Sequence, residues 1–135
     1  MALFDISAED VAAGTLAKPS WYKATVKNIT EEPAKKQKDP SQIVMVTHVT
    51  FVLEGAKKDD DSDAGPVTVK AYFPSNAPGM AVNFCNAFGE NIGKEGKKGV
   101  EISNERHRGK SCKVYVERGS FEGRSTNNVK DFMKV

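Results

Sequence analysis

The chain has 135 residues, 39% hydrophobic and 28% charged, a balance typical of one globular domain and not of a disordered chain. Residues 1–90 hold 9 Lys and Arg against 12 Asp and Glu, whereas residues 91–135 hold 11 against 6. The net charge of +2 therefore hides a basic C-terminal third, and such an asymmetry indicates an anionic partner.

The predicted elements, in chain order, are an arm, three strands, one helix and two further strands. Each strand is a run in which apolar and polar residues alternate, as expected when one face is buried. Apolar residues spaced i, i+4, i+7 and i+8 indicate the helix, which Ser75 or Asn76 is expected to cap and Gly89 to end. The segments are an arm at 1–18 and a single domain at 19–135, with strands at about 20–30, 42–54, 67–73, 110–118 and 127–133 and a helix at about 78–88.

The segments between these elements are read from their composition. Residues 89–109 show no sustained period and predict a long connection, and residues 119–126 predict a turn or loop. The resulting order β-β-β-α-β-β predicts a mainly β fold, the OB-fold, a partly open five-stranded barrel with one helix between the third and fourth strands. An α+β sandwich has the same element order and stays open as an alternative.

The outward faces of three predicted strands combine lysines with aromatic rings. Single-stranded nucleic acid needs both, because cations track the phosphates and flat rings stack on unpaired bases. The rings predicted to stack are Trp21, Tyr72, Tyr115 and Phe121. The cations predicted to contact phosphates are Lys23, Lys27, Lys35, Lys36, Lys70, Lys113, Arg118 and Arg124. The alternative is that these rings cover a small second core under the arm or a subunit interface.

The sequence offers no convergent set of catalytic or metal-binding residues, so we expect neither an enzyme nor a cofactor. The histidines His48 and His107 lie in no HxxxH or HExxH spacing, and neither GxSxG nor a P-loop is present. The acidic run 59–63 resembles half of a calcium loop but lacks its final acidic residue. We interpret this run as a solvated loop.

We expect a cytoplasmic protein with no membrane partner. No apolar run approaches the ~18 residues of a membrane-spanning helix, and the acidic N-terminal stretch lacks the basic start of a signal peptide. Cys85 and Cys112 lie far apart within apolar patterns, which predicts two buried thiols.

Motifs along nearly the whole chain share a pattern with one family. They are Phe4-Asp5, the strand entry "PSWYKATV", the strand end "FVLEG", Ala87-Phe88-Gly89, "GKSCKVYV", and the trio Asn127, Val129 and Phe132. In these features the chain resembles the small OB-fold single-stranded DNA-binding proteins of tailed bacteriophages. The resemblance implies a protein that coats transient single strands during phage DNA replication or recombination, without base specificity, in the host cell cytoplasm.

Two expectations about partners follow. Many single-stranded DNA-binding proteins recruit replication or recombination proteins through an acidic tail, whereas this chain ends "VKDFMKV", so recruitment of that kind is not expected. A homodimer is compatible with a domain of this kind. The alternative function is a non-enzymatic protein–protein interaction module, such as a phage factor that acts on a host protein, which the acidic run 59–63 would also serve.

Overall fold

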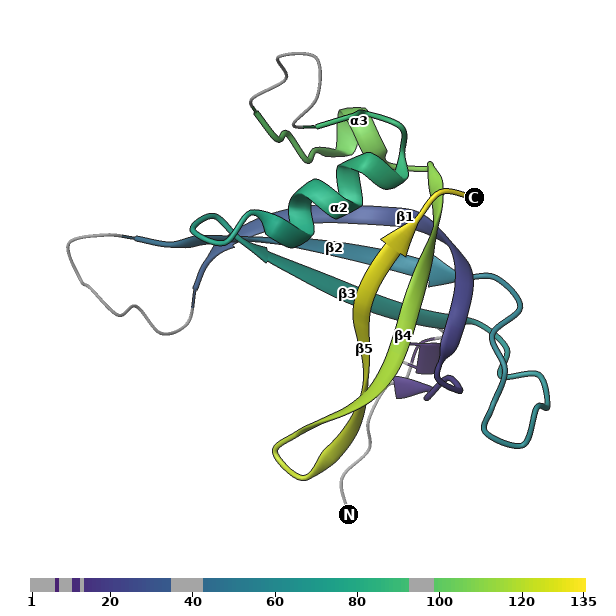
Figure 1. Cartoon of the computed structure of the whole chain (residues 1–135). Helices are drawn as coiled ribbons and strands as arrows, with labels where there is room; N and C mark the ends of the chain where they lie inside the picture. The colour runs from purple at the N-terminus through teal and green to yellow at the C-terminus, as the bar shows by residue number, and fades with distance from the viewer. Residues whose placement is uncertain (1–6, 8–10, 13, 35–42, 93–98) are drawn as a thin grey trace.

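The computed structural model describes residues 7, 11–12, 14–34, 43–92 and 99–135. It shows a mainly β fold, with one five-stranded antiparallel sheet and the helices α2 and α3 (Figure 1). The elements are β1 (Ser20–Pro33), β2 (Met45–Leu53), β3 (Val67–Pro74), α2 (Gly79–Ala87), α3 (Asn104–His107), β4 (Ser111–Phe121) and β5 (Arg124–Met133). Within the described residues, no helix is long and apolar enough to cross a membrane.

The strands follow the order β3-β2-β1-β4-β5 across the sheet, and every neighbouring pair is antiparallel. The five predicted strands and the helix between the third and fourth are confirmed. The strands β3 and β5 form the two edges, and no ladder joins them among the described residues. The predicted closure into an OB-fold barrel is therefore not established by the strand pairing.

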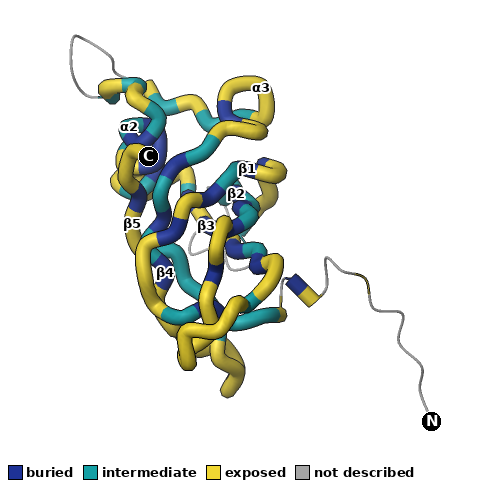
Figure 2. The backbone as a smooth tube through the Cα atoms, turned by 90° about the vertical axis from the view of Figure 1, so that its right-hand side faces the viewer, coloured by how far each residue is buried: buried dark blue, intermediate teal, exposed yellow. Residues whose placement is uncertain are grey.

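The alternation of residues along the strands sorts core from surface, as predicted. In β1, Tyr22, Ala24 and Val26 are buried, whereas Trp21 and Lys23 are exposed. The same alternation recurs along the other strands, where buried positions lie between half-buried and exposed ones (Figure 2). Burial of the alternate residues gives the sheet one apolar face, and that face carries the core.

The ring of Phe84, from α2, lies at the centre of the core. Its centroid is 6.0 Å from that of Phe51, 5.4 Å from Phe73 and 5.5 Å from Phe132. Aromatic rings at these separations attract each other in tilted or edge-to-face geometry. Because these partners come from β2, β3 and β5, the helix holds the two edge strands together at one end of the sheet (Figure 1).

The ends of α2 differ in part from prediction. Pro78 occupies the N-cap position without a side-chain hydrogen bond to the helix, so the expected cap from Ser75 or Asn76 is wrong. Pro suits this end because its missing N–H would have no partner within the helix. Gly89 follows the C-cap residue with φ +81°, a conformation that glycine adopts without steric cost, so the predicted stop is confirmed.

Both segments predicted to be irregular, residues 89–109 and 119–126, contain regular secondary structure. Residues 104–107 form α3, where the Ser103 hydroxyl accepts from the Arg106 backbone N–H as an N-cap. The side chain of Asn104 then bonds both backbone groups of Ile29, at 2.9 and 3.0 Å, and so ties α3 to β1. The sequence pattern missed α3 because four residues are too few to show a helical period.

The strands β4 and β5 form a long hairpin that ends in a two-residue turn. Glu122 and Gly123 have φ of 51° and 78°, the positive values of a type I′ turn. The turn predicted within residues 119–126 is therefore confirmed at residues 122–123, but it is shorter than predicted because both strands continue into this segment. Both views place this hairpin at the opposite end of the molecule from α2 and α3 (Figures 1 and 2).

Candidate nucleic-acid interface

A groove of about 800 Å³ lies between the two unpaired edges of the sheet. We call it the β3–β5 groove. It is lined by Gly14 and Leu16 of the arm, Thr68 to Tyr72 of β3, and Ser120, Phe121 and Ser125 to Lys130 of the β4–β5 hairpin. It brings together segments that are some 50 residues apart in the sequence.

The β3 wall of the groove presents Tyr72 beside Lys70. The Tyr72 side chain is 57% exposed. His48, its neighbour on β2, packs against this ring edge-on with centroids 4.8 Å apart. A ring held at its edge keeps its exposed surface in a fixed orientation, which is the arrangement a stacking platform requires.

The hairpin wall of the groove presents Phe121, which is 67% exposed and is the last residue of β4. An apolar ring this exposed has no role in the core. Lower on the hairpin, the Asn128 side chain lies over Gly119, where a Cβ atom would come within 2.0 Å of the Asn128 amide nitrogen. Gly119 therefore makes room for a polar side chain at the groove surface.

The described residues that line the groove carry a net positive charge. Lys70 and Lys130 are among its described lining residues, and no Asp or Glu is. Because the two rings and the two lysines share one concave surface, the groove offers both the stacking and the charge that a flexible anionic chain needs.

The other two predicted stacking rings lie elsewhere. Trp21 and Tyr115 are directly opposite each other on β1 and β4, with centroids 5.4 Å apart. Tyr72 of β3 lies opposite His48 of β2, and His48 lies opposite Thr30 of β1. Thr30 is nine residues from Trp21 along β1, or about 30 Å of extended chain. The predicted set is therefore split between two surfaces.

We call the second surface the Trp21 patch. It consists of Trp21, Lys23, Glu54, Lys113, Tyr115, Asp131 and Met133. In one row Lys23 lies opposite Lys113, a like-charge pair that costs stability. Glu54 lies 3.7 Å from Lys23, whereas Lys113 has no carboxylate within ion-pair distance among the described residues.

Arg118, predicted to contact phosphate, is bound to the protein itself. Its guanidinium donates to both carboxylate oxygens of Asp59, at 3.0 and 3.4 Å, and to the Ala17 carbonyl at 3.0 Å. Lys18 pairs with Asp61 of the same loop at 2.6 Å. The acidic run 59–63 is thus fastened to β4 and to the end of the arm, rather than being only a solvated loop.

The remaining predicted contacts are scattered. Lys27 lies at a bulge of β1, where the pairing with β2 shifts between Val26 and Asn28. Arg124 lies opposite Phe121 beside the hairpin turn. Lys35 and Lys36 lie outside the described residues.

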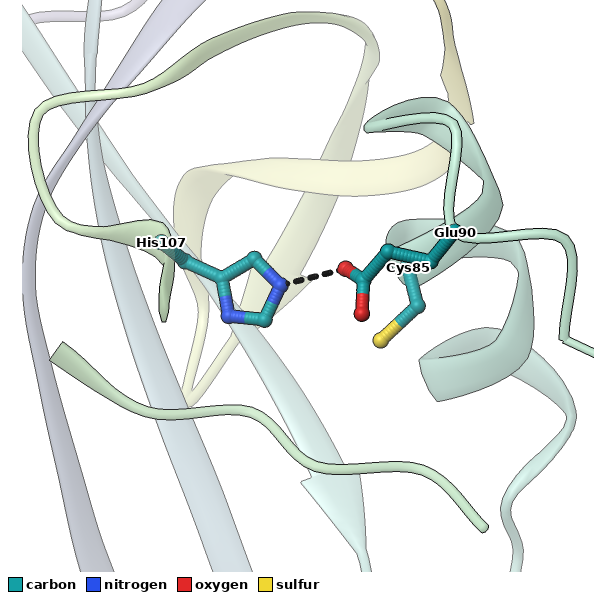
Figure 3. Close-up of side chains that lie close together, drawn as sticks. All are labelled: Cys85, Glu90 and His107. Carbon is teal, nitrogen blue, oxygen red and sulfur yellow. Dashed lines mark hydrogen bonds and ion pairs between the residues drawn. The ribbon is translucent and has the colours of Figure 1, made fainter. Parts of the chain in front are cut away.

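Three possible metal ligands meet at the end of α2: Cys85 of the helix, Glu90 just after it, and His107 of α3 (Figure 3). Their ligand atoms all lie within 4.8 Å of one another, and they are of the kinds that Zn²⁺ accepts. Sequence spacing could not reveal this cluster, because its members come from a helix, a loop and α3. Arg106 forms an ion pair with the second oxygen of Glu90.

The hydrogen bonds of this cluster favour a proton, and not a metal ion, between His107 and Glu90. The Ser103 N–H donates to His107 Nδ1 at 3.4 Å, which leaves the proton on Nε2, 2.7 Å from a Glu90 oxygen. Coordination of a metal through Nε2 would need the reverse, a bare Nε2 and an Nδ1–H that donates to an acceptor. The cluster therefore belongs to the scaffold and ties the end of α2 to α3.

Titration in the cluster agrees with this role. Burial raises the pKa of the Cys85 thiol to about 12, and the Glu90 charge adds to the effect, so the thiol is protonated and unreactive at neutral pH. Burial alone would raise the pKa of Glu90, but hydrogen bonds from His107 and Arg106 outweigh it and lower the pKa from its usual 4.5. Cys112 is also buried, and burial raises its pKa to about 12.

Comparison with known proteins adds no assignment. No protein-family model and no curated protein matches this sequence. The geometry of the chain is therefore the basis for any proposal. Of the predicted site residues, it brings Lys70, Tyr72 and Phe121 together in one groove.

Proposed function

We propose that the protein binds single-stranded DNA in the β3–β5 groove, without base specificity and without catalysis. The observation that carries the proposal is the meeting of two exposed rings, Tyr72 and Phe121, with Lys70 and Lys130 on one concave surface, whose described lining residues include no Asp or Glu. Phosphates would lie against the lysines, and bases would stack on the rings.

The strand order supports an OB-fold with an open seam as the scaffold for this function. An OB-fold is a partly open barrel, and it binds oligonucleotides on its second and third strands, between the loops that follow the first and fourth strands. Here β3 supplies one wall of the groove and the β4–β5 hairpin supplies the other. Coating of transient single strands in DNA replication or recombination is the role that such binding would serve.

The groove chemistry also favours weak base preference. Every base has a flat face that can stack, and lysine contacts phosphate as a point charge. Base readout by hydrogen bonds would need free and fixed donors and acceptors, and one of the two lining asparagines, Asn127, already uses its amide to bond the Ala17 N–H and the Thr15 carbonyl.

The experiment is a titration of fluorescently labelled oligo(dT), followed by anisotropy at low and at raised salt. The proposal expects tight binding at low salt that weakens steeply as salt is added, because bound cations release counterions from the strand. It expects oligo(dA) to bind within an order of magnitude of oligo(dT). Absence of binding at low salt, or binding indifferent to salt, would contradict the proposal.

A further inference from the structure

We propose that the Trp21 patch is a contact surface between two copies of this chain, packed face to face about a two-fold axis. This inference is independent of DNA binding, because it concerns a surface outside the β3–β5 groove. It rests on the charges, the exposed apolar groups and the strand register of the patch.

The patch is self-complementary in charge. It carries two lysines, Lys23 and Lys113, and two carboxylates, Glu54 and Asp131. A surface that pairs with its own copy must hold both members of each pair. The two-fold axis would lie in the plane of the interface and run between Lys113 and Asp131. It would place each Lys113 opposite Asp131 of the other copy, and this carboxylate would offset the repulsion between Lys113 and Lys23.

The same axis leaves the apolar groups in the centre. Trp21 is 38% exposed and Met133 is 43% exposed, and Tyr115 lies between β1 and β5 in the register. Near a two-fold axis these side chains would meet the same residues of the other copy. Aromatic residues and Met are enriched at protein interfaces, where their desolvation supplies much of the binding energy.

The seven residues of the Trp21 patch are fewer than a whole interface contains. A standard interface buries about 800 Å² on each partner. The seven residues of the patch would form its centre, and outward residues of β1, β4 and β5 around them would form its rim. The sheet offers such a surface because the outer side of β1 and β4 is not covered by α2 or α3 (Figure 1).

The balance of charge argues against nucleic acid as the occupant. The patch has as many carboxylates as lysines, whereas the β3–β5 groove has lysines alone among its described charged lining residues. A polyanion gains little from a surface without net positive charge. A second copy of the chain can form ion pairs with both the lysines and the carboxylates of the patch.

The test is the mass of the full chain in solution, measured by size-exclusion chromatography with light scattering in the absence of DNA. The proposal expects the wild-type chain to reach twice the 14.7 kDa mass of one copy as its concentration rises. Lys113→Asp and Asp131→Lys should each give the mass of a single copy, because each places like charges across the axis. Lys70→Asp, the same change in the groove, should leave the dimer intact.

Mixing the two charge-reversed variants is the decisive step. One variant has an acidic patch and the other a basic patch, so the mixture should recover the mass of two copies. Circular dichroism confirms that each variant is folded, and Lys113→Glu replaces Lys113→Asp if that variant does not fold. A wild-type chain that stays single at every concentration, variants that still dimerise, or a mixture that stays single would each overturn the proposal.

Discussion

The β3–β5 groove and the Trp21 patch both present exposed aromatic rings beside lysines, but they differ in shape and in charge. The groove is concave and its described lining includes no carboxylate, whereas the patch lies on an outer sheet face with Glu54 and Asp131 among its lysines. An aromatic ring beside a lysine therefore does not by itself define a nucleic-acid site. The neighbours that the sheet places around them decide what partner fits.

The largest expected effect is the loss of DNA affinity when the aromatic rings of the β3–β5 groove are removed. Replacing Tyr72 and Phe121 by Ala should weaken oligo(dT) binding by about 1–3 kcal/mol for each ring that stacks on a base. Both side chains are exposed, so the melting temperature should change little. Anisotropy and thermal unfolding measure the two quantities.

The matched control is the double replacement of Trp21 and Tyr115 by Ala. It removes two rings of the same kind from the Trp21 patch and should leave the affinity of each chain for a short oligonucleotide within about twofold. Equal losses from both double variants would show that the two surfaces bind DNA together.

A change far from both surfaces should alter stability and leave the groove intact. Glu90→Gln removes the charge that accepts from His107 and Arg106, and hydrogen bonds to charged groups contribute about 1.5–3 kcal/mol each. Because the folded pKa of Glu90 is lowered, its contribution is fully present above its unfolded pKa of about 4.5 and is lost as pH falls through the lower folded value.

Chemical denaturation between pH 7 and pH 3 measures this effect. The wild-type chain should lose stability below about pH 4.5 more steeply than the Glu90→Gln variant. Addition of Zn²⁺ should not raise the melting temperature of either chain, because the Nε2 proton of His107 is engaged with Glu90. A marked stabilisation by Zn²⁺ that Cys85→Ser abolishes would contradict the assignment of this cluster to the scaffold.

Arg118 tests whether a cation near the groove serves DNA or the fold. Arg118→Ala should cost about 1–2 kcal/mol of unfolding free energy, because it removes hydrogen bonds to Asp59 and to the Ala17 carbonyl. Asp59→Ala, which removes the same pair from its other side, should give a similar but smaller loss. The opposite pattern, weaker DNA binding for Arg118→Ala and tighter binding for Asp59→Ala, would make Arg118 a phosphate contact that the loop blocks.

The smallest effect concerns salt. Each phosphate contact contributes about 0.7 to the slope of log K against log salt for a single strand. Lys70→Ala and Lys130→Ala should each flatten the slope by about that amount. Lys23→Ala and Lys113→Ala, on the Trp21 patch, should leave it unchanged, and a flatter slope in either would contradict the separation of the two surfaces.

The sequence predicted most of the fold because alternation and helical spacing are local signals. It placed Trp21 outside and the alternate positions of the same strand inside, and the structure confirms both, with Tyr22, Ala24 and Val26 buried. It missed α3, because a four-residue helix shows no period. It predicted the turn between the last two strands but made it too long, because the loop composition of "GSFEGRST" hid two strand ends.

The site was less accessible to sequence analysis. Alternation tells which residues face outward, but not which outward residues share a surface. The prediction therefore groups Tyr72 with Trp21, although Tyr72 is aligned with a position of β1 nine residues from Trp21. The ion pair of Arg118 with Asp59 joins residues 59 positions apart, and no local pattern encodes it. These are long-range contacts set by the order of strands in the sheet.

The position of a single tryptophan tests most directly whether DNA binds in the β3–β5 groove. Trp21 is the only tryptophan of the chain and lies outside the groove, so adding unlabelled oligo(dT) should change its fluorescence little. In a variant with Trp21→Phe and Tyr72→Trp, the one tryptophan lies in the groove, and stacked bases should quench it strongly at stoichiometric DNA. Strong quenching of Trp21 in the wild-type chain, with none at position 72 in the variant, would contradict the account.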